Sequence, residues 1–282
     1  MSEPRPTLSI ILPAHNEADF MAPCLRAVLA SDDRGFDVQL IVIANACTDN
    51  TVQVAESFAT DAQRKGWRFE VINTAEPGKL NALNLGDAQA KGTVRAYLDA
   101  DVVVTPDLMR QIVEALHCDT PLYASGSPVV SPAKSGVTRA YGRVWQRLPF
   151  VTTGVPGFGL FAVNSQGRAR WGAFPDIISD DTFVRLSFTP NERLRVPATY
   201  SWPMVEGLRN LVLVRRRQDK GVEEIAAQFP ELLQNDNTPK PGMGTMLRIA
   251  LSDPIGFGVY LLVKLAVKTP YASSAQRWAR GR

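Results

Sequence analysis

Hydrophobic residues follow two alternating patterns along the first 120 residues of the chain. Short runs that are almost wholly apolar predict buried strands, at residues 8–12, 38–44, 69–72 and 94–98. Between these runs, apolar residues recur every three or four positions, which predicts helices at residues 17–31, 52–62, 79–91 and 106–118. Strands that alternate with helices are typical of βαβ units. We therefore predict an α/β fold with a mostly parallel, Rossmann-like sheet flanked by helices.

The pattern changes beyond residue 121. One strand is predicted at 122–130 and an extended segment at 193–199, and helices are predicted at 136–149, 205–220 and 245–268. Residues 235–244 are rich in Pro, Gly and Asn and read as a linker. We expect a sheet-containing domain over residues 1–204 and a helical C-terminal extension over 205–282.

Composition and charge narrow the function classes. The 282 residues are 45% hydrophobic and 21% charged, which is ordinary for a globular protein. Residues 205–282 carry a net charge of +5 and the rest of the chain −2, so the basic excess lies in the extension. Three cysteines without C-x-x-C spacing favour neither a disulfide framework nor structural zinc and fit a reducing, cytoplasmic setting. The N-terminus does not resemble a signal peptide, and residues 255–267 are too short to span a bilayer.

Four polar loops follow the first four predicted strands: PAHNE, NACTDN, AEPGK and DAD. Ligands of parallel sheets bind outside the carboxyl ends of the strands, and all four loops fall at that edge. None contains G-x-G-x-x-G or G-x-x-x-x-G-K-[ST], which disfavours a dinucleotide-binding dehydrogenase or a P-loop nucleotidase.

Asp99 and Asp101 end the fourth predicted strand. Carboxylates at positions i and i+2 of an extended segment face the same side, where they repel each other unless a cation lies between them. Oxygen ligands suit Mg²⁺ or Mn²⁺ bridged to substrate phosphates. The alternative is that both carboxylates only solvate the end of a buried strand.

A second acidic pair, Asp180-Asp181, follows Ser179 at the start of a predicted short helix. Acidic residues in a first helical turn are favoured by the helix dipole alone, so a structural role is the alternative to a catalytic one.

Six motifs, in this order, resemble those of a family 2 glycosyltransferase with a GT-A fold. They are SIILPAHNE, VIANACTDNT, GKLNALNLG, YLDADVVV, GFGLFAVN and SDDTFVRL, and they cover roughly residues 7–190. The resemblance implies transfer of a sugar from a nucleotide donor to an acceptor hydroxyl with inversion at the anomeric carbon. It also implies a nucleotide-sugar half at about 1–118 and an acceptor half at about 119–204.

The resemblance assigns roles to individual residues. The nucleotide-sugar contacts would be Pro13, Ala14, Glu17, Asn45, Asp49, Lys79 and Asp99. Asp101 would hold the metal, Mn²⁺ or Mg²⁺, and Asp181 would be the catalytic base, with Asp180 as its neighbour. The acceptor would lie at Gly157, Phe158, Gly159 and Trp171. Arg215 and Arg217 would approach the diphosphate. Lys79, Trp171 and the arginines have ordinary structural alternatives, as an exposed lysine, a core aromatic and a solvated surface.

The sequence departs from the family pattern in two places. Val214 and Gln218 stand at the Gln and Trp positions of Q-x-x-R-W, which puts processive polymer synthesis in doubt. Ala44 and Asn45 stand where family members usually carry Asp, which weakens the case for uracil as the base.

The chemistry of sugar transfer requires the same two acidic sites. Departure of a nucleoside diphosphate needs neutralisation of its charge, and the acceptor hydroxyl needs a carboxylate to take its proton.

Three alternative functions match the sequence less well than sugar transfer does. A dehalogenase-type phosphohydrolase wants Thr where Val103 stands, and a sugar nucleotidyltransferase wants a Gly-rich basic loop after the first strand. A non-catalytic, membrane-associated sugar-nucleotide-binding or interaction protein is the alternative outside the enzymes.

The final predicted helix, 245–268, combines apolar residues with Arg248, Lys264 and Lys268, and Arg277 lies beyond it. Such a helix can lie at a membrane surface, which would suit a lipid-linked acceptor. It can equally pack on the catalytic domain or on a second copy in a homodimer. The expected partners are a nucleotide-sugar donor and a carbohydrate or lipid-linked acceptor, and we expect no nucleic acid.

Overall fold

The computed structural model describes residues 5–269, so Arg277 lies outside the described residues. Within that range the chain forms two compact units, each assembled from segments that are distant in sequence. The first unit comprises residues 5–128, 157–176 and 187–201, and the second comprises 129–156, 177–186 and 202–269. The sequence predicts a single boundary at residue 204, whereas these units exchange segments several times along the chain. The predicted division into a catalytic domain and a C-terminal extension stays a prediction.

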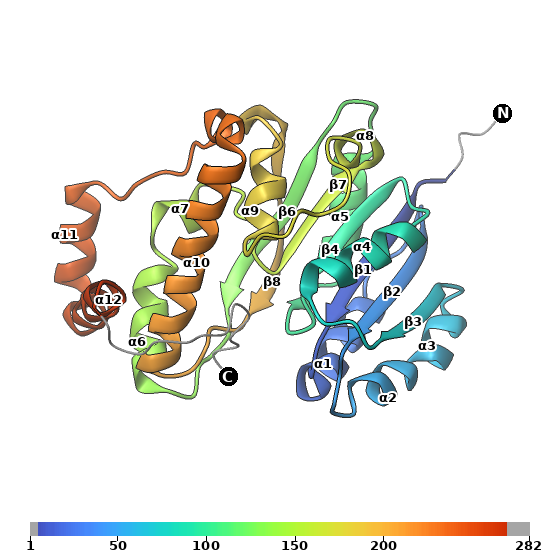
Figure 1. Ribbon diagram of the computed structural model, residues 1–282, viewed down its shortest axis with the longest axis horizontal. Helices are drawn as coiled ribbons and strands as arrows, with labels where there is room; N and C mark the ends of the chain where they lie inside the picture. The colour runs from blue at the N-terminus through green and yellow to red at the C-terminus, as the bar shows by residue number, and fades with distance from the viewer. Residues whose placement is uncertain (1–4, 270–282) are drawn as a thin grey trace. The chain divides into compact units, whose positions relative to one another are not determined.

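The strands of residues 5–269 form one eight-stranded sheet in the order β3-β2-β1-β4-β7-β6-β8-β5 (Figure 1). The strands are β1 (Thr7–Ala14), β2 (Asp37–Asn45), β3 (Arg68–Thr74), β4 (Val94–Leu98), β5 (Val103–Val104), β6 (Tyr123–Val130), β7 (Leu160–Asn164) and β8 (Arg193–Trp202). Strands β3, β2, β1 and β4 are parallel neighbours, whereas β7 pairs antiparallel with β4 and β6, and β5 with β8. The predicted α/β class is confirmed.

Helices of the first unit connect these strands. They are α1 (Ala18–Leu29), α2 (Thr51–Glu56), α3 (Ala59–Arg64), α4 (Lys79–Gln89), α5 (Leu108–Leu116), α8 (Ser165–Arg168) and the 3₁₀ turn η1 (Pro190–Glu192). Helix α4 packs against β1 and β2. Gly86 permits this close approach, because a Cβ there would lie 2.5 Å from Cγ2 of Ile11 and 2.8 Å from Cδ1 of Ile43.

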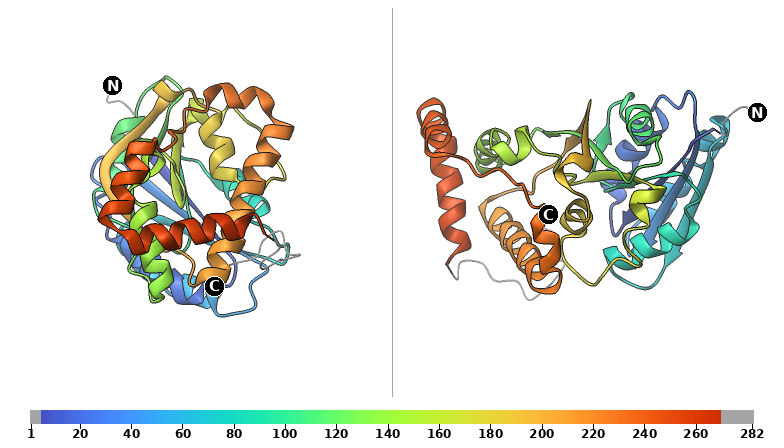
Figure 2. Two further views of the ribbon diagram at one scale, coloured as in Figure 1. Left: turned by 90° about the vertical axis from the view of Figure 1, so that its left-hand side faces the viewer. Right: turned by 90° about the horizontal axis from the view of Figure 1, so that it is seen from above.

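The second unit is mainly helical. Its helices are α6 (Gly136–Trp145), α7 (Pro149–Thr152), α9 (Asp180–Leu186), α10 (Leu208–Gln228), the 3₁₀ helix η2 (Pro230–Asn235), α11 (Met243–Ser252) and α12 (Pro254–Val267). Helix α12 packs against α6, α10 and α11 (Figure 2). No helix within residues 5–269 has both the length and the apolar composition needed to cross a bilayer.

Two helices of the first unit differ from the prediction. The single helix expected at 52–62 is divided into α2 and α3. At the division the Phe58 N–H donates to the carbonyl of Ala55, three residues earlier, whereas an α-helix would use the carbonyl four residues earlier. Helix α5 begins at Leu108, after a turn in which the Leu108 N–H bonds the Thr105 carbonyl, so Pro106 precedes the helix.

The prediction of a single helix at 245–268 is also wrong, because α11 ends at Ser252 and α12 begins at Pro254. Proline has no N–H and disfavours helical backbone in the residue before it. Asp253 accordingly leaves the helical region, at φ −145° and ψ 74°, and its carboxylate accepts a hydrogen bond from the Gly256 N–H. The Asp253-Pro254 pair therefore ends one helix and caps the next.

A buried charge cluster anchors α4 to the sheet of the first unit. The side chain of Asp87, on α4, is 5% exposed and lies 2.7 Å from a guanidinium nitrogen of both Arg95 and Arg168. It also accepts a hydrogen bond of 2.9 Å from the hydroxyl of Tyr97. Burial, followed by the charge of Asp87, raises the pKa of Tyr97, so its hydroxyl stays a donor.

We expect Asp87→Asn to lower the free energy of unfolding by about 3 kcal/mol, because it removes one partner of a buried ion pair and leaves two arginines uncompensated. Urea unfolding followed by circular dichroism measures the effect. Asp61→Asn is the matched control, since the Asp61–Arg64 pair is exposed and should contribute at most about 1 kcal/mol. Equal losses in both variants would contradict the structural role of the cluster.

Candidate active site

The carboxyl ends of the parallel strands are joined in the first unit by the side chain of Asn45. This residue ends β2 and is 4% exposed. Its amide nitrogen donates to the Ala14 carbonyl at the end of β1 (2.8 Å), and its amide oxygen accepts from the Gly78 N–H just before α4 (3.2 Å). One buried amide thus connects three of the four polar loops that the sequence placed at this edge.

A second set of hydrogen bonds joins the loops after β1 and β2. The Asn16 side-chain oxygen accepts from the Thr48 N–H (2.7 Å), and the Asp49 carboxylate accepts from the N–H of Ala18 (3.2 Å). Burial alone would raise the pKa of Asp49, but bonds from Thr51 and Ala18 outweigh it and lower that pKa. Glu17, immediately before α1, donates its N–H to the Thr51 hydroxyl.

Lys79 and Asp99 bring the remaining loop to the same edge. The Lys79 ammonium, at the first residue of α4, lies 2.9 Å from a carboxylate oxygen of Asp99, which follows β4. The Asp99 N–H in turn donates to the Gly159 carbonyl, so the glycine-rich segment before β7 joins the group. A line of contacts therefore runs through all four loops to the predicted acceptor segment. Pro13 and Ala14 lie at its buried end, as the last two residues of β1.

The metal-ligating side chains at this edge of the sheet supply only part of the ligands that a divalent cation needs. No cluster of three or more His, Cys, Asp or Glu side chains suited to a metal occurs in residues 5–269. A half-buried carboxylate at Asp101 is the hard oxygen ligand that Mg²⁺ and Mn²⁺ take when substrate phosphates and water supply the other ligands. Asp101 therefore carries the type of oxygen ligand that these metals take, and its role as a metal ligand stays a prediction.

The glycine-rich segment has a backbone that only glycine adopts without strain. Gly157 and Gly159 have φ angles of +72° and +78°. A Cβ at Gly157 would also overlap the Tyr123 hydroxyl. The Phe158 carbonyl accepts a hydrogen bond of 2.8 Å from Tyr200, which holds the segment against β8.

Trp171, predicted to contact the acceptor, packs among side chains of the first unit. It is 9% exposed, and the Arg168 guanidinium carbon lies 4.6 Å from the ring centroid. Phe174 and Phe188 meet the ring edge-on. The ring therefore has a structural role, and an acceptor contact stays a prediction.

Asp180 and Asp181 lie in the second unit and begin α9, directly after Ser179. Asp180 is buried and Asp181 half-buried, and an Asp181 carboxylate oxygen accepts from the Thr182 N–H (2.7 Å). Helix α10 supports this turn: the Glu224 carboxylate accepts from the Ile178 N–H (2.9 Å), and a Cβ at Gly221 would overlap the Ser179 hydroxyl.

The arginine run 215–217 makes contacts within the second unit. Arg215 lies 2.9 Å from Asp219, one turn along α10. Arg216 donates to the carbonyls of Ala266 and Val267 at the end of α12. Arg215 and Arg216 thus have structural partners, and a diphosphate contact by Arg215 or Arg217 stays a prediction.

Sequence reasoning missed two asparagines that organise the first unit. Asn16 has a φ of +53°, a region that Asn tolerates better than most residues, and it orients the NACTDN loop. Asn84 accepts from the Phe174 N–H (2.7 Å) and so ties α4 to the segment that leads toward α9. The positions of these asparagines inside the PAHNE and GKLNALN motifs were the available signal.

Comparison with known proteins identifies the family. The model of glycosyl transferase family 2 matches residues 9–169, more than half of the chain. The chain belongs to glycosyl transferase family 2.

Similar curated proteins include an uncharacterized glycosyltransferase of a Nostoc species (32% identity over 110 residues) and the glycosyltransferase AglE of Haloferax volcanii (30% over 102 residues). The matches cover 39% and 36% of this chain and 33% and 32% of those proteins. The matched region therefore spans about a third of the length of these relatives.

Solved structures share the fold at low sequence identity. A mannosyltransferase of Pyrobaculum calidifontis in complex with GDP-Man and Mn²⁺ superposes with a TM-score of 0.58 at 19% identity, covering 96% of this chain and 77% of that one. Glucosyl-3-phosphoglycerate synthase of Mycobacterium tuberculosis in complex with uridine-diphosphate superposes with 0.51 at 21% identity, covering 84% and 82%. The predicted GT-A fold is confirmed.

We expect Asn45→Ala to lower the free energy of unfolding by about 2 kcal/mol, because the Ala14 carbonyl and the Gly78 N–H lose their buried partner. Urea unfolding measures the loss. Asn73→Ala, at an exposed position of β3, should change stability by less than about 0.5 kcal/mol. A loss no greater than that of the control would show that the three loops do not depend on Asn45.

Proposed function

We propose that this chain is an inverting glycosyltransferase that moves a sugar from a nucleoside-diphosphate sugar to the hydroxyl of a carbohydrate or lipid-linked acceptor. The observation that carries the proposal is the line of contacts from Ala14 through Asn45, Gly78 and Lys79 to Asp99 and Gly159. It gathers polar side chains and a cation at the edge of a parallel sheet where ligands bind.

In this proposal the first unit holds the donor. Pro13, Ala14 and Glu17 line the nucleotide pocket, and the turn from Asn45 to Asp49 flanks the base. Asp99 meets the donor ribose or sugar, and the Lys79 ammonium offsets part of the charge of the diphosphate. Asp101 holds Mn²⁺ or Mg²⁺, which supplies Lewis-acid neutralisation of the departing diphosphate when bound.

The reaction breaks the bond between the anomeric carbon and the diphosphate oxygen, and that oxygen leaves with the electron pair. The acceptor oxygen forms the new bond from the opposite face, which inverts the anomeric carbon. Asp181 takes the acceptor proton, and its hydrogen bond from the Thr182 N–H orients one carboxylate oxygen. The acceptor approaches along the segment Gly157 to Gly159.

Two neighbours of the same fold are complexes with GDP-Man and with uridine-diphosphate. Both nucleotides are therefore the first to test. The alternative proposal, a non-catalytic sugar-nucleotide-binding or interaction protein, predicts binding without turnover.

We expect the chain to bind GDP or UDP more tightly with Mn²⁺ than without it, and Asp101→Asn to abolish that difference, because the amide is a poorer ligand than the carboxylate. Isothermal titration with and without Mn²⁺ measures both affinities. Asp119→Asn, in an exposed loop, is the matched control. Metal-independent binding, or none with any of the common nucleoside diphosphates, would refute metal-assisted transfer.

We expect Asp181→Asn to lower kcat by about 10²- to 10⁴-fold while leaving nucleotide affinity unchanged, because only proton acceptance is lost. Release of nucleoside diphosphate from a panel of GDP- and UDP-sugars, with water or added sugars as acceptor, measures turnover. Unchanged kcat in this variant would remove Asp181 from the mechanism. Nucleotide binding without turnover in the unmodified chain would favour the non-catalytic alternative.

A further inference from the structure

The helices α11 and α12 of the second unit expose an unusual number of large apolar side chains. We call this set the α11/α12 apolar face. Its members are Met243, Leu247, Leu251, Ile255, Leu261, Leu262 and Leu265, with exposed fractions from 39% for Leu261 to 89% for Met243. Scattered exposed leucines are normal in a soluble protein, whereas a group of seven on two successive helices indicates an interaction surface.

Geometry places these side chains together on each helix. On α11, Met243, Leu247 and Leu251 recur every four residues and form one stripe. On α12, the opposite side is attached to α6: a Cβ at Gly256 would lie 2.9 Å from the Ala140 carbonyl, and Tyr260 stacks on Tyr141 at 5.9 Å. A helix that is apolar on nearly all sides is normally covered on most of them, but α12 keeps four large apolar side chains exposed beside its contacts with α6, α10 and α11.

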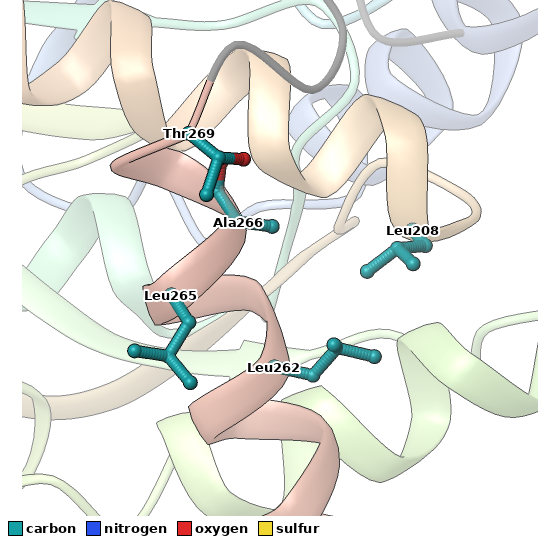
Figure 3. Close-up of a pocket in the computed structure, with 5 residues that line it drawn as sticks. All are labelled: Leu208, Leu262, Leu265, Ala266 and Thr269. Atoms are coloured by element: carbon teal, nitrogen blue, oxygen red, sulfur yellow. The ribbon is translucent and has the colours of Figure 1, made fainter.

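Exposed side chains of α12 also line a pocket. Leu262 and Leu265 line a pocket of about 290 Å³ together with Leu208, Ala266 and Thr269 (Figure 3). The Thr269 hydroxyl donates to the Ala266 carbonyl (2.9 Å), so the lining offers mainly aliphatic carbon. Such a pocket suits a hydrocarbon chain better than a sugar or a nucleotide.

The two helices of the apolar face also carry positive charge. Arg248 on α11, Lys264 on α12 and Lys268 at its end are exposed. The one acidic residue in the sequence 243–268 is Asp253, which is paired with Arg143 of α6 at 2.8 Å. Hydrogen bonds from Arg143 lower the pKa of Asp253 to about 2, so the pair stays ionised and Asp253 does not offset the other cations.

We propose that the α11/α12 apolar face docks on the surface of an anionic lipid bilayer. The leucines enter the boundary between headgroups and acyl chains, and the three cations meet lipid phosphates, as in interfacial amphipathic helices. The proposal goes beyond the proposed transferase activity and does not depend on it.

Two other occupants fit these observations less well. A nucleic acid would match the cations but would leave seven apolar side chains against a phosphate backbone. A second copy related by two-fold symmetry would bring the same patch of both copies together, so that the cations of each copy would lie near those of the other.

Flotation of the full chain with vesicles tests the proposal. We expect the protein to float with vesicles of phosphatidylglycerol and phosphatidylcholine, and much less with phosphatidylcholine alone or in high salt. Leu251→Glu/Leu265→Glu should lower the bound fraction more than tenfold. Both leucines are exposed, at 77% and 63%, so this variant should keep the far-ultraviolet circular dichroism of the unmodified chain.

Val129→Glu/Val222→Glu is the matched control, because it adds the same charge at exposed apolar positions of the second unit outside the apolar face. It should reduce the bound fraction far less than the leucine variant. Lys264→Ala/Lys268→Ala should weaken partitioning by about 25-fold, on the basis of about fivefold per cation near an anionic surface.

Three results would overturn the proposal. The first is that the intact chain does not float with anionic vesicles. The second is that the leucine and control variants lose binding equally. The third is a dimer of the intact chain that Leu251→Glu/Leu265→Glu dissociates in gel filtration without any flotation, which would assign the face to a second copy. Nucleotide titration of the same preparations reports separately on the transferase proposal.

Discussion

The hydrogen bonds of the buried Asn45 amide are the constraint on which the candidate site depends. Parallel strands place their carboxyl ends at one edge, but the loops that follow are polar and need partners to hold one conformation. Asn45 supplies a donor for the Ala14 carbonyl and an acceptor for the Gly78 N–H at once. An aspartate in its place could accept from Gly78 but could not donate to Ala14. Asn45 is therefore a structural requirement of this loop arrangement.

Charge is used differently in the two places where it is concentrated. In the first unit, Asp87 is almost fully enclosed between Arg95 and Arg168, where a partner is required because an isolated buried charge is costly. At the sheet edge, Lys79 and Asp99 are each about a third exposed, and a partly solvated ion pair is weak enough to be exchanged for a charged ligand. The same pairing chemistry thus gives rigidity beneath α4 and leaves a replaceable contact at the site.

Much of the fold and part of the site could be predicted. Buried parallel strands are almost wholly apolar, so β1, β2 and β4 were identified close to their observed bounds, and the loops between them held the motifs that resemble family 2. Asn16 and Asn84 were missed because their roles depend on backbone groups distant in sequence, at Thr48 and Phe174. For Trp171 the sequence left a core position and an acceptor contact both open, since periodicity does not reveal that Arg168 and two phenylalanines enclose its ring.

The sequence by itself determined the α/β class, the family and the placing of the polar loops at one sheet edge, because these follow from local periodicity and from motifs in order. Only the tertiary structure decided which segments form each compact unit. It also decided where the C-terminal helices begin and end and which of their side chains are exposed. A helix that is apolar on nearly all sides has too weak a pattern to mark its covered side. Contact of Gly256 and Tyr260 with α6 made that choice for α12 and left Leu261, Leu262 and Leu265 exposed. The apolar face and the exposed cations of the same two helices are therefore properties of the folded second unit.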